Sequence, residues 1–128
     1  MRSARAQEFG TIDPSVFSVV TGGFWNLGGH DGEIRLVVTT QGFDHLISRL
    51  YVQWLEHMPE GMPTPILRTM QVKDIPEVWT LGVPVFKHVD DGWIATIDGT
   101  NTHQNPPATE HWTLTFGAPG DVHVHKGK

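Results

Sequence analysis

The C-terminal part of the chain alternates apolar and polar residues around a short loop that ends in glycine, and this pattern constrains the fold most. In the stretch TEHWTLTFGAPGDVHVHK, the loop of residues 118–120 has three members, and its glycine suits the left-handed position of such loops. The loop sets Phe116 opposite Val122 on an apolar face and Thr115 opposite His123 on a polar face. Because a slip of one residue would invert every side chain, the agreement of both faces predicts an antiparallel hairpin in this register.

A second loop of the same form, residues 90–92 with the sequence DDG, lies earlier in the chain. Glycine at its third position predicts the same three-residue geometry, which pairs Val89 with Trp93. In this register, His88 and Asp98 lie together on the face opposite to Val89. We therefore expect one sheet face to combine histidine and aspartate side chains with the threonines of the last hairpin.

The N-terminal part of the chain also predicts strands. Residues 16–25 are rich in β-branched and aromatic side chains, and two adjacent glycines within them indicate a bulge or bend. A turn cluster, NLGGHDG, separates them from residues 33–41, where apolar residues alternate, so a hairpin is expected. Residues 66–73 predict a further strand, and an extended segment follows Pro76.

A helical spacing of apolar residues sets the fold class that we expect. Counted from Phe43, the apolar side chains fall at offsets 0, 3, 4, 7, 8, 11, 12 and 15. Thr40 or Gly42 can cap the start of such a helix, and Pro59 stops it. These features predict an amphipathic helix over residues 43–58, packed on a twisted antiparallel sheet of six or seven strands. The expected fold is α+β, of the roll or partial-barrel type.

The composition is that of one ordinary globular domain. The 128 residues are 38% apolar and 18% charged, and a chain of this size buries enough surface to fold without disulfides. We expect residues 1–13, which are polar and aperiodic, to form a disordered leader before a single domain over residues 14–128. The chain has no cysteine, which excludes thiolate metal sites and a cysteine nucleophile and suits a cytoplasmic protein.

Charge and hydropathy restrict the partners of the chain. The formal net charge is −5 and no basic stripe is present to neutralise phosphates, so we do not expect nucleic acid binding. No run of 18 apolar residues occurs, so no membrane-spanning segment is expected. The end strands carry few prolines or lysines that would protect a sheet edge, which favours a homodimer.

Two histidines at strand spacing, His123 and His125, raise the question of a metal site. At about 3.3 Å per residue their backbones are about 7 Å apart, but His111 and His123 are on the order of 14 Å apart. Zinc bound at about 2 Å by each imidazole cannot readily take all three. Positions 113 and 115, which face the pair, are both threonine. We therefore expect neither a metal site nor a cofactor.

Two classes of function stay open from the sequence. We favour a small non-enzymatic binding protein that engages a protein partner or a small ligand, because the chain has no nucleophile or cofactor motif. The candidate ligand-binding residues are His111, Thr113, Thr115, His123, His125 and Trp25. The alternative is a small pocket enzyme, a hydrolase or isomerase, that uses a His/Asp pair as general acid and base in a tryptophan-lined cavity. The candidate catalytic residues are His88, Asp98 and His111.

Overall fold

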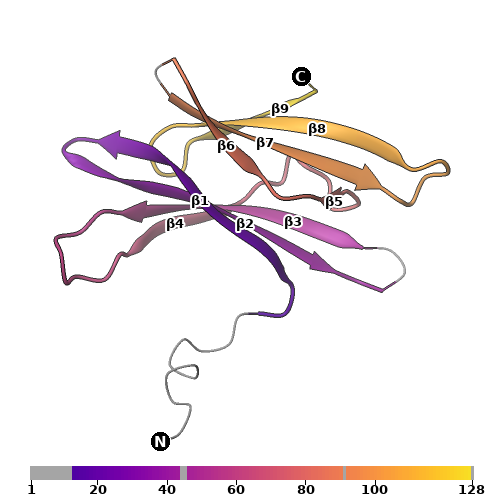
Figure 1. Ribbon diagram of the computed structural model, residues 1–128, viewed down its shortest axis with the longest axis horizontal. Coiled ribbons are helices and arrows are strands. Elements are labelled where there is room, and N and C mark those ends of the chain that lie inside the picture. The colour runs from indigo at the N-terminus through magenta and orange to yellow at the C-terminus, as the bar shows by residue number, and fades with distance from the viewer. Residues whose placement is uncertain (1–12, 44–45, 91, 128) are drawn as a thin grey trace, which may run out of the picture.

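The computed structural model describes residues 13–43, 46–90 and 92–127, which form nine strands in two antiparallel sheets. The first sheet follows the order of the sequence: β1 (Val16–Leu27), β2 (His30–Gln41), β3 (Ile47–Glu56) and β4 (Ile66–Gln71). The second contains β5 (Thr80–Leu81), β6 (Val85–Val89), β7 (Gly92–Asn101), β8 (Ala108–Phe116) and β9 (Val122–Lys126). Its order is β5-β7-β8-β9, and β6 also pairs with β7. Figure 1 shows the two sheets as two layers.

The expected α+β fold with a helix over residues 43–58 is wrong. The described residues contain no helix, and β3 occupies most of this range, while residues 44 and 45 lie outside the described part of the chain. The stretch carries a period-two pattern beside the helical one, since Ser48, Leu50, Val52 and Trp54 are all buried. Val52 distinguishes the two patterns, because each predicts a different environment for it. A helix would place Val52 on its polar side, whereas in the strand it is 0% exposed.

The neighbouring strands explain why residues 47–56 form a β-strand and not a helix. β2 sets its buried residues opposite those of β3, and the pairs are Val38 with Leu50, Leu36 with Val52, and Ile34 with Trp54. Cross-strand apolar pairs of this kind stabilise a sheet, and β4 adds a second ladder on the other side of β3. These tertiary contacts decide between two periodicities that are both present in the local sequence.

One core lies between the sheets, so the fold is a β-sandwich and not the expected roll or partial barrel. Its buried apolar side chains come from both sheets and from the segment between them: Trp25, Ile34, Leu36, Val38, Leu50, Val52, Trp54, Val72, Ile75, Leu81, Ala95, Ile97, Trp112 and Leu114. Hydrogen bonds also join the layers: Leu81 N–H donates to Ser48 Oγ at 3.1 Å, and Trp54 Nε1 donates to the Gly117 carbonyl at 3.3 Å. Each sheet therefore has one face in the core and one face outward.

The register of the last hairpin is confirmed. β8 and β9 pair Phe116 with Val122 and Thr115 with His123, as the loop sequence predicts. Gly120, at the end of the loop, has φ of 95°, in the left-handed region that favours glycine. The threonines of β8 and the histidines of β9 consequently share the outward face of the second sheet.

The predicted register of the earlier hairpin is wrong by one residue. β6 and β7 pair Val89 with Gly92, so Gly92 begins a strand instead of ending a three-residue loop. The shift turns Phe86 toward the interior, where it packs against the core. His88 is then opposite Trp93 and lies on the inward side of the sheet, away from the face that we expected it to share. Burial of the phenylalanine ring thus outweighs the loop preference of one glycine.

The predicted N-terminal hairpin is confirmed. Gly28 and Gly29 join β1 to β2 with φ of 57° and 84°, which is the geometry of a tight two-residue turn. The register shifts between Gly22 and Phe24, so the expected bulge is present, and Gly23 has φ of 66°. β1 forms one edge of the first sheet, and none of its residues is charged.

The start of the described chain is held by a local hydrogen-bond pair. The Asp13 carboxylate accepts from the backbone N–H of Ser15 at 2.9 Å and from its hydroxyl at 2.8 Å, and these bonds lower the pKa of Asp13. The rest of the predicted leader, residues 1–12, lies outside the described residues. Across the described ranges, no helix is long and apolar enough to cross a membrane.

Candidate functional site

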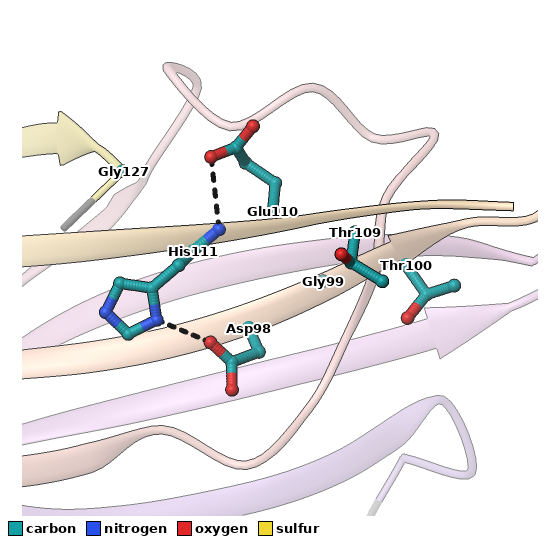
Figure 2. Close-up of a pocket in the computed structure, with 7 residues that line it drawn as sticks. All are labelled: Asp98, Gly99, Thr100, Thr109, Glu110, His111 and Gly127. Carbon is teal, nitrogen blue, oxygen red and sulfur yellow. Dashed lines mark hydrogen bonds and ion pairs between the residues drawn. The ribbon is translucent and has the colours of Figure 1, made fainter.

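A groove of about 580 Å³ opens on the outward face of the second sheet, at the end where a loop joins β7 to β8. Figure 2 shows the residues that line it, which are Asp98, Gly99, Thr100, Thr109, Glu110, His111 and Gly127. The ladder between the two strands sets Asp98 opposite His111 and Thr100 opposite Thr109. Most of the lining therefore stands on paired strands, which hold side chains more rigidly than a loop does.

The imidazole of His111 and the carboxylate of Asp98 form the closest polar contact in the groove. Nδ1 of His111 lies 2.5 Å from Oδ1 of Asp98, and Figure 2 shows the imidazole turned toward the carboxylate. Because an ionised carboxylate can only accept, this contact holds a proton on Nδ1 and leaves Nε2 as the acceptor of the neutral ring. The side chain of Asp98 is 80% exposed and that of His111 is 34% exposed, so the pair is open to solvent.

The backbone of His111 is fixed from two sides. Its N–H donates to Oε2 of Glu110 at 3.2 Å, and its carbonyl accepts from the N–H of Gly127 at 2.6 Å, just beyond the end of β9. The Glu110 carboxylate also lies 3.8 Å from Nζ of Lys126. The Glu110 side chain points to the other side of β8 from the imidazole, as Figure 2 shows, so Asp98 supplies the carboxylate on the outward face of the groove.

A glycine allows the groove to lie directly over the core. Gly99 is between Asp98 and Thr100 on β7, and a Cβ at this position would come within 2.8 Å of the Trp112 ring. The tryptophan packs against the bare backbone and also meets Trp79 edge to face at 5.3 Å between ring centroids. The two outward side chains that flank Gly99 are consequently positioned by a rigid aromatic layer beneath them.

The other candidate residues of the outward face do not reach the groove. Thr113 is opposite His125 and Thr115 is opposite His123 on the β8–β9 ladder, farther from the β7–β8 loop. None of these four is among the residues that line the groove. His123 instead places Nε2 at 3.0 Å from Oδ1 of Asp121, its neighbour in the turn.

Two further candidates lie elsewhere in the sandwich. His88 is on the inward side of β6, with its ring centroid 4.7 Å from that of Trp93, so it does not pair with Asp98. Trp25 is buried in the core, where Nε1 donates to the carbonyl of Leu55 at 2.9 Å. The structure thus brings Asp98 and His111 together and separates both from His88 and Trp25.

Metal-binding groups do not converge in the part of the chain that the structure describes. No three histidine, aspartate or glutamate side chains there are arranged to hold one ion. Near the start of β2 one histidine has two carboxylates close by, because the His57 nitrogens lie 3.5 Å from Asp31 Oδ1 and 3.8 Å from Glu33 Oε2. The expectation that the purified protein carries no metal stays a prediction, which elemental analysis would test.

Sequence reasoning missed Thr100, Thr109 and Glu110. The signal that would have found them is the pairing of Asp98 with His111, since extending that ladder by two residues places Thr100 opposite Thr109. Chemically, the arrangement offers a fixed carboxylate, two neighbouring hydroxyls and an imidazole nitrogen that can accept a proton. Neither a family model, nor a curated protein, nor a solved structure matches the chain.

Proposed function

We propose that the protein is a small non-enzymatic binding protein whose β7–β8 groove receives a small ligand or a side chain of a protein partner. The observation that carries the proposal is the Asp98 carboxylate, which is 80% exposed at the groove while His111 orients it from 2.5 Å. A group that is already held in one orientation loses little freedom when a ligand arrives, and this favours affinity.

The chemistry of the lining favours a ligand that donates hydrogen bonds. The carboxylate of Asp98 can only accept, and the hydroxyls of Thr100 and Thr109 can accept as well. An ammonium group would also neutralise the negative charge of the groove. Amines and compounds with several hydroxyl groups therefore fit this site best, and a volume of about 580 Å³ is within the range of small-molecule sites.

A thermal-shift screen of amines, amino acids and polyols tests the proposal, because a ligand that binds only the folded state raises the Tm. We expect compounds that raise it to lose most of the shift in Asp98→Asn and in Thr109→Val. Thr96→Val is the matched control, since Thr96 is on the same face of β7 but is not among the groove residues. The proposal fails if no compound stabilises the protein, or if the active compounds act equally on all three variants.

The same pair of residues supports a second candidate function, general acid–base catalysis of the hydrolase or isomerase type. Asp98 orients the His111 ring and leaves Nε2 able to exchange a proton with a bound substrate. The exposure of the pair favours binding over catalysis, because acid–base sites work best where water is excluded. Incubation with a ligand from the screen, followed by mass spectrometry, separates the two functions. Conversion that disappears in His111→Gln would replace the binding proposal, and recovery of unchanged ligand supports it.

We also propose that the protein forms a homodimer through the edge strand β1. This strand exposes Phe17, Val19, Phe24 and Leu27 and carries no charge that would repel a second copy. Two copies can pair their β1 strands antiparallel about a two-fold axis, which covers both edges at once. Light scattering at micromolar concentration is expected to give the mass of a dimer, and the mass of a monomer would refute the proposal.

For the compartment we propose the cytoplasm. A chain without cysteine needs no oxidising environment to fold, which agrees with this assignment. Cell fractionation followed by immunoblotting tests it, and recovery of the protein in an exported fraction would overturn it.

A further inference from the structure

We propose a second binding site, for a neutral oligosaccharide, on the outward face of the first sheet. A hollow of about 330 Å³ lies there, and its lining includes Val37, Thr39, Arg49, Tyr51, Gln53 and Thr69. The hollow is on the opposite layer of the sandwich from the β7–β8 groove. The proposal therefore does not depend on the function proposed for that groove.

The centre of the hollow combines an aromatic ring with an aliphatic side chain. Tyr51 of β3 is directly opposite Val37 of β2, so the phenol ring and the isopropyl group form one apolar surface. A pyranose ring presents a face of C–H groups, which packs well on such a surface. The tyrosine hydroxyl adds a donor and an acceptor for a sugar hydroxyl at the same place.

A fixed amide lies on one side of Tyr51. Oε1 of Gln53 accepts from Nε of Arg35 at 2.8 Å, and Nε2 of Gln53 donates to the hydroxyl of Thr69 at 3.3 Å. These two bonds set the direction of the amide plane and leave one N–H and one lone pair of the amide for a ligand. An amide that is oriented in advance can accept from one sugar hydroxyl and donate to another at small entropic cost.

A fixed guanidinium lies on the other side of Tyr51. Nε and Nη2 of Arg49 donate to the two carboxylate oxygens of Glu77 at 2.8 and 3.4 Å, and Gln71 Nε2 donates to the same carboxylate at 3.2 Å. The pair raises the pKa of Arg49 and lowers that of Glu77, so both groups stay ionised. Nη1 of Arg49 donates to Gln41 Oε1 at 3.5 Å, a long bond that leaves this nitrogen with donor capacity toward the hollow.

The charge balance favours a neutral ligand over an anion. Glu77 compensates the charge of Arg49, and the Asp13 carboxylate at the rim of the hollow adds a negative charge. An anion would have to compete with Glu77 for the guanidinium and would be repelled by Asp13. A neutral ligand rich in hydroxyls can hydrogen-bond to the amide, the hydroxyls and the remaining donors of the guanidinium. It neither competes with Glu77 for the guanidinium nor is repelled by Asp13.

The length of the polar row favours an oligosaccharide over a single sugar. Arg49, Tyr51 and Gln53 occupy successive outward positions of β3. With a rise of about 3.3 Å per residue, the row is about 13 Å long, which exceeds one sugar ring. Along this line Arg49 offers hydrogen-bond donors, Tyr51 a ring and Gln53 an amide. Each group can contact a different unit of a sugar chain.

NMR titration of the labelled protein tests the site. Cellopentaose, xylopentaose, maltopentaose, mannopentaose and chitopentaose are added separately, and we expect at least one to cause saturable shifts centred on Tyr51, Gln53 and Thr69. Tyr51→Ala should raise the dissociation constant for that sugar by about tenfold or more. Tyr51→Phe, which keeps the ring, should change the dissociation constant by less than about threefold. Thr96→Val, on the other sheet, should bind as the unaltered protein does. If the spectrum of Tyr51→Ala is that of an unfolded chain, Gln53→Ala is used in its place. Gln53→Ala should also weaken binding of the sugar.

Three results would overturn the assignment. The first is the absence of saturable shifts with every sugar up to about 10 mM, a concentration that detects dissociation constants in the millimolar range. The second is a heparin-derived tetrasaccharide that shifts the same residues more strongly than any neutral sugar, which would identify an anion site. The third is a response to neutral sugars that is confined to Asp98 and Thr109, which would place sugar binding in the β7–β8 groove.

Discussion

Replacement of Val52 by alanine tests the strand assignment of residues 47–56 directly. Val52 is 0% exposed and lies opposite Leu36 in the middle of the core face. The change removes two buried methyl groups, and at about 0.8 kcal/mol for each the lost transfer free energy is about 1.6 kcal/mol. The cavity left in a tightly packed core raises the expected loss of unfolding free energy to roughly 2–3 kcal/mol.

Replacement of Ile47 by alanine is the matched control, because the two patterns assign Ile47 and Val52 to opposite environments. In the helical pattern Ile47 faces the core and Val52 faces solvent, whereas in β3 Ile47 is 39% exposed. The change at Ile47 removes more carbon atoms than the change at Val52. It should nevertheless cost about 1.5 kcal/mol, less than the change at Val52, since 39% of Ile47 is already in contact with water.

Urea unfolding followed by tryptophan fluorescence measures both changes, with the free energy obtained by linear extrapolation. A domain of this kind has a stability of about 5–15 kcal/mol, so a loss of 2–3 kcal/mol is readily resolved. Equal slopes of the transitions would show that the two variants unfold from comparable folded states. A larger loss for Ile47→Ala than for Val52→Ala would refute the strand assignment and restore the helix.

Three further predictions concern stability. Gly32→Ala should cost more than about 3 kcal/mol, because a Cβ there would overlap the Leu55 carbonyl oxygen and lie 2.7 Å from Trp25 Nε1; a Tm close to that of the unaltered protein would contradict this. The hydrogen bond from Arg49 lowers the pKa of Glu77 from its ordinary 4.5, so the pair stabilises the fold above this pH and the stabilisation is lost as the pH falls through the folded pKa. Glu77→Gln should therefore weaken the pH dependence of urea unfolding below pH 4.5, and an unchanged dependence would disprove the linkage. Trp25→Phe keeps a ring in the core but removes the donor to the Leu55 carbonyl, which should cost about 1–2 kcal/mol in the same assay, and a neutral effect would mean that this bond is dispensable.

The first and last hairpins were the predictable part of the fold, because their loops carry glycine signals between alternating strands, whereas the same signal gave the wrong register for β6 and β7. The loop of residues 118–120 sets the register of β8 and β9, and Gly28 with Gly29 joins β1 to β2. The stretch of residues 43–58 could not be assigned, since its apolar residues satisfy both a helical and an alternating pattern. Only the presence of β2 and β4 on either side decides between them, and that information is not local.

The candidate site was only partly predicted, again because the pairing of distant residues is not a local property of the sequence. Asp98 and His111 were identified by residue type, but the loop between β7 and β8 is too wide for its Asn-Pro-Pro turn signal to fix the register of the two strands. Their neighbours Thr100 and Thr109 were consequently missed. His88 was placed on the wrong face, because the observed register of the β6–β7 hairpin differs by one residue from the predicted one.

The division of the chain between the two sheets has a consequence for how the protein folds. Residues 16–71 contain the whole first sheet and residues 80–126 the whole second sheet, so most strand pairings join neighbours in sequence. Such local pairings close short loops and form rapidly, whereas joining the two sheets is the one step that brings distant residues together. Before that step each sheet presents a bare apolar face to water, with Trp54 on one and Trp112 on the other. The vulnerable species during refolding is thus a pair of formed but undocked sheets, and tryptophan burial should lag behind the gain of strand structure.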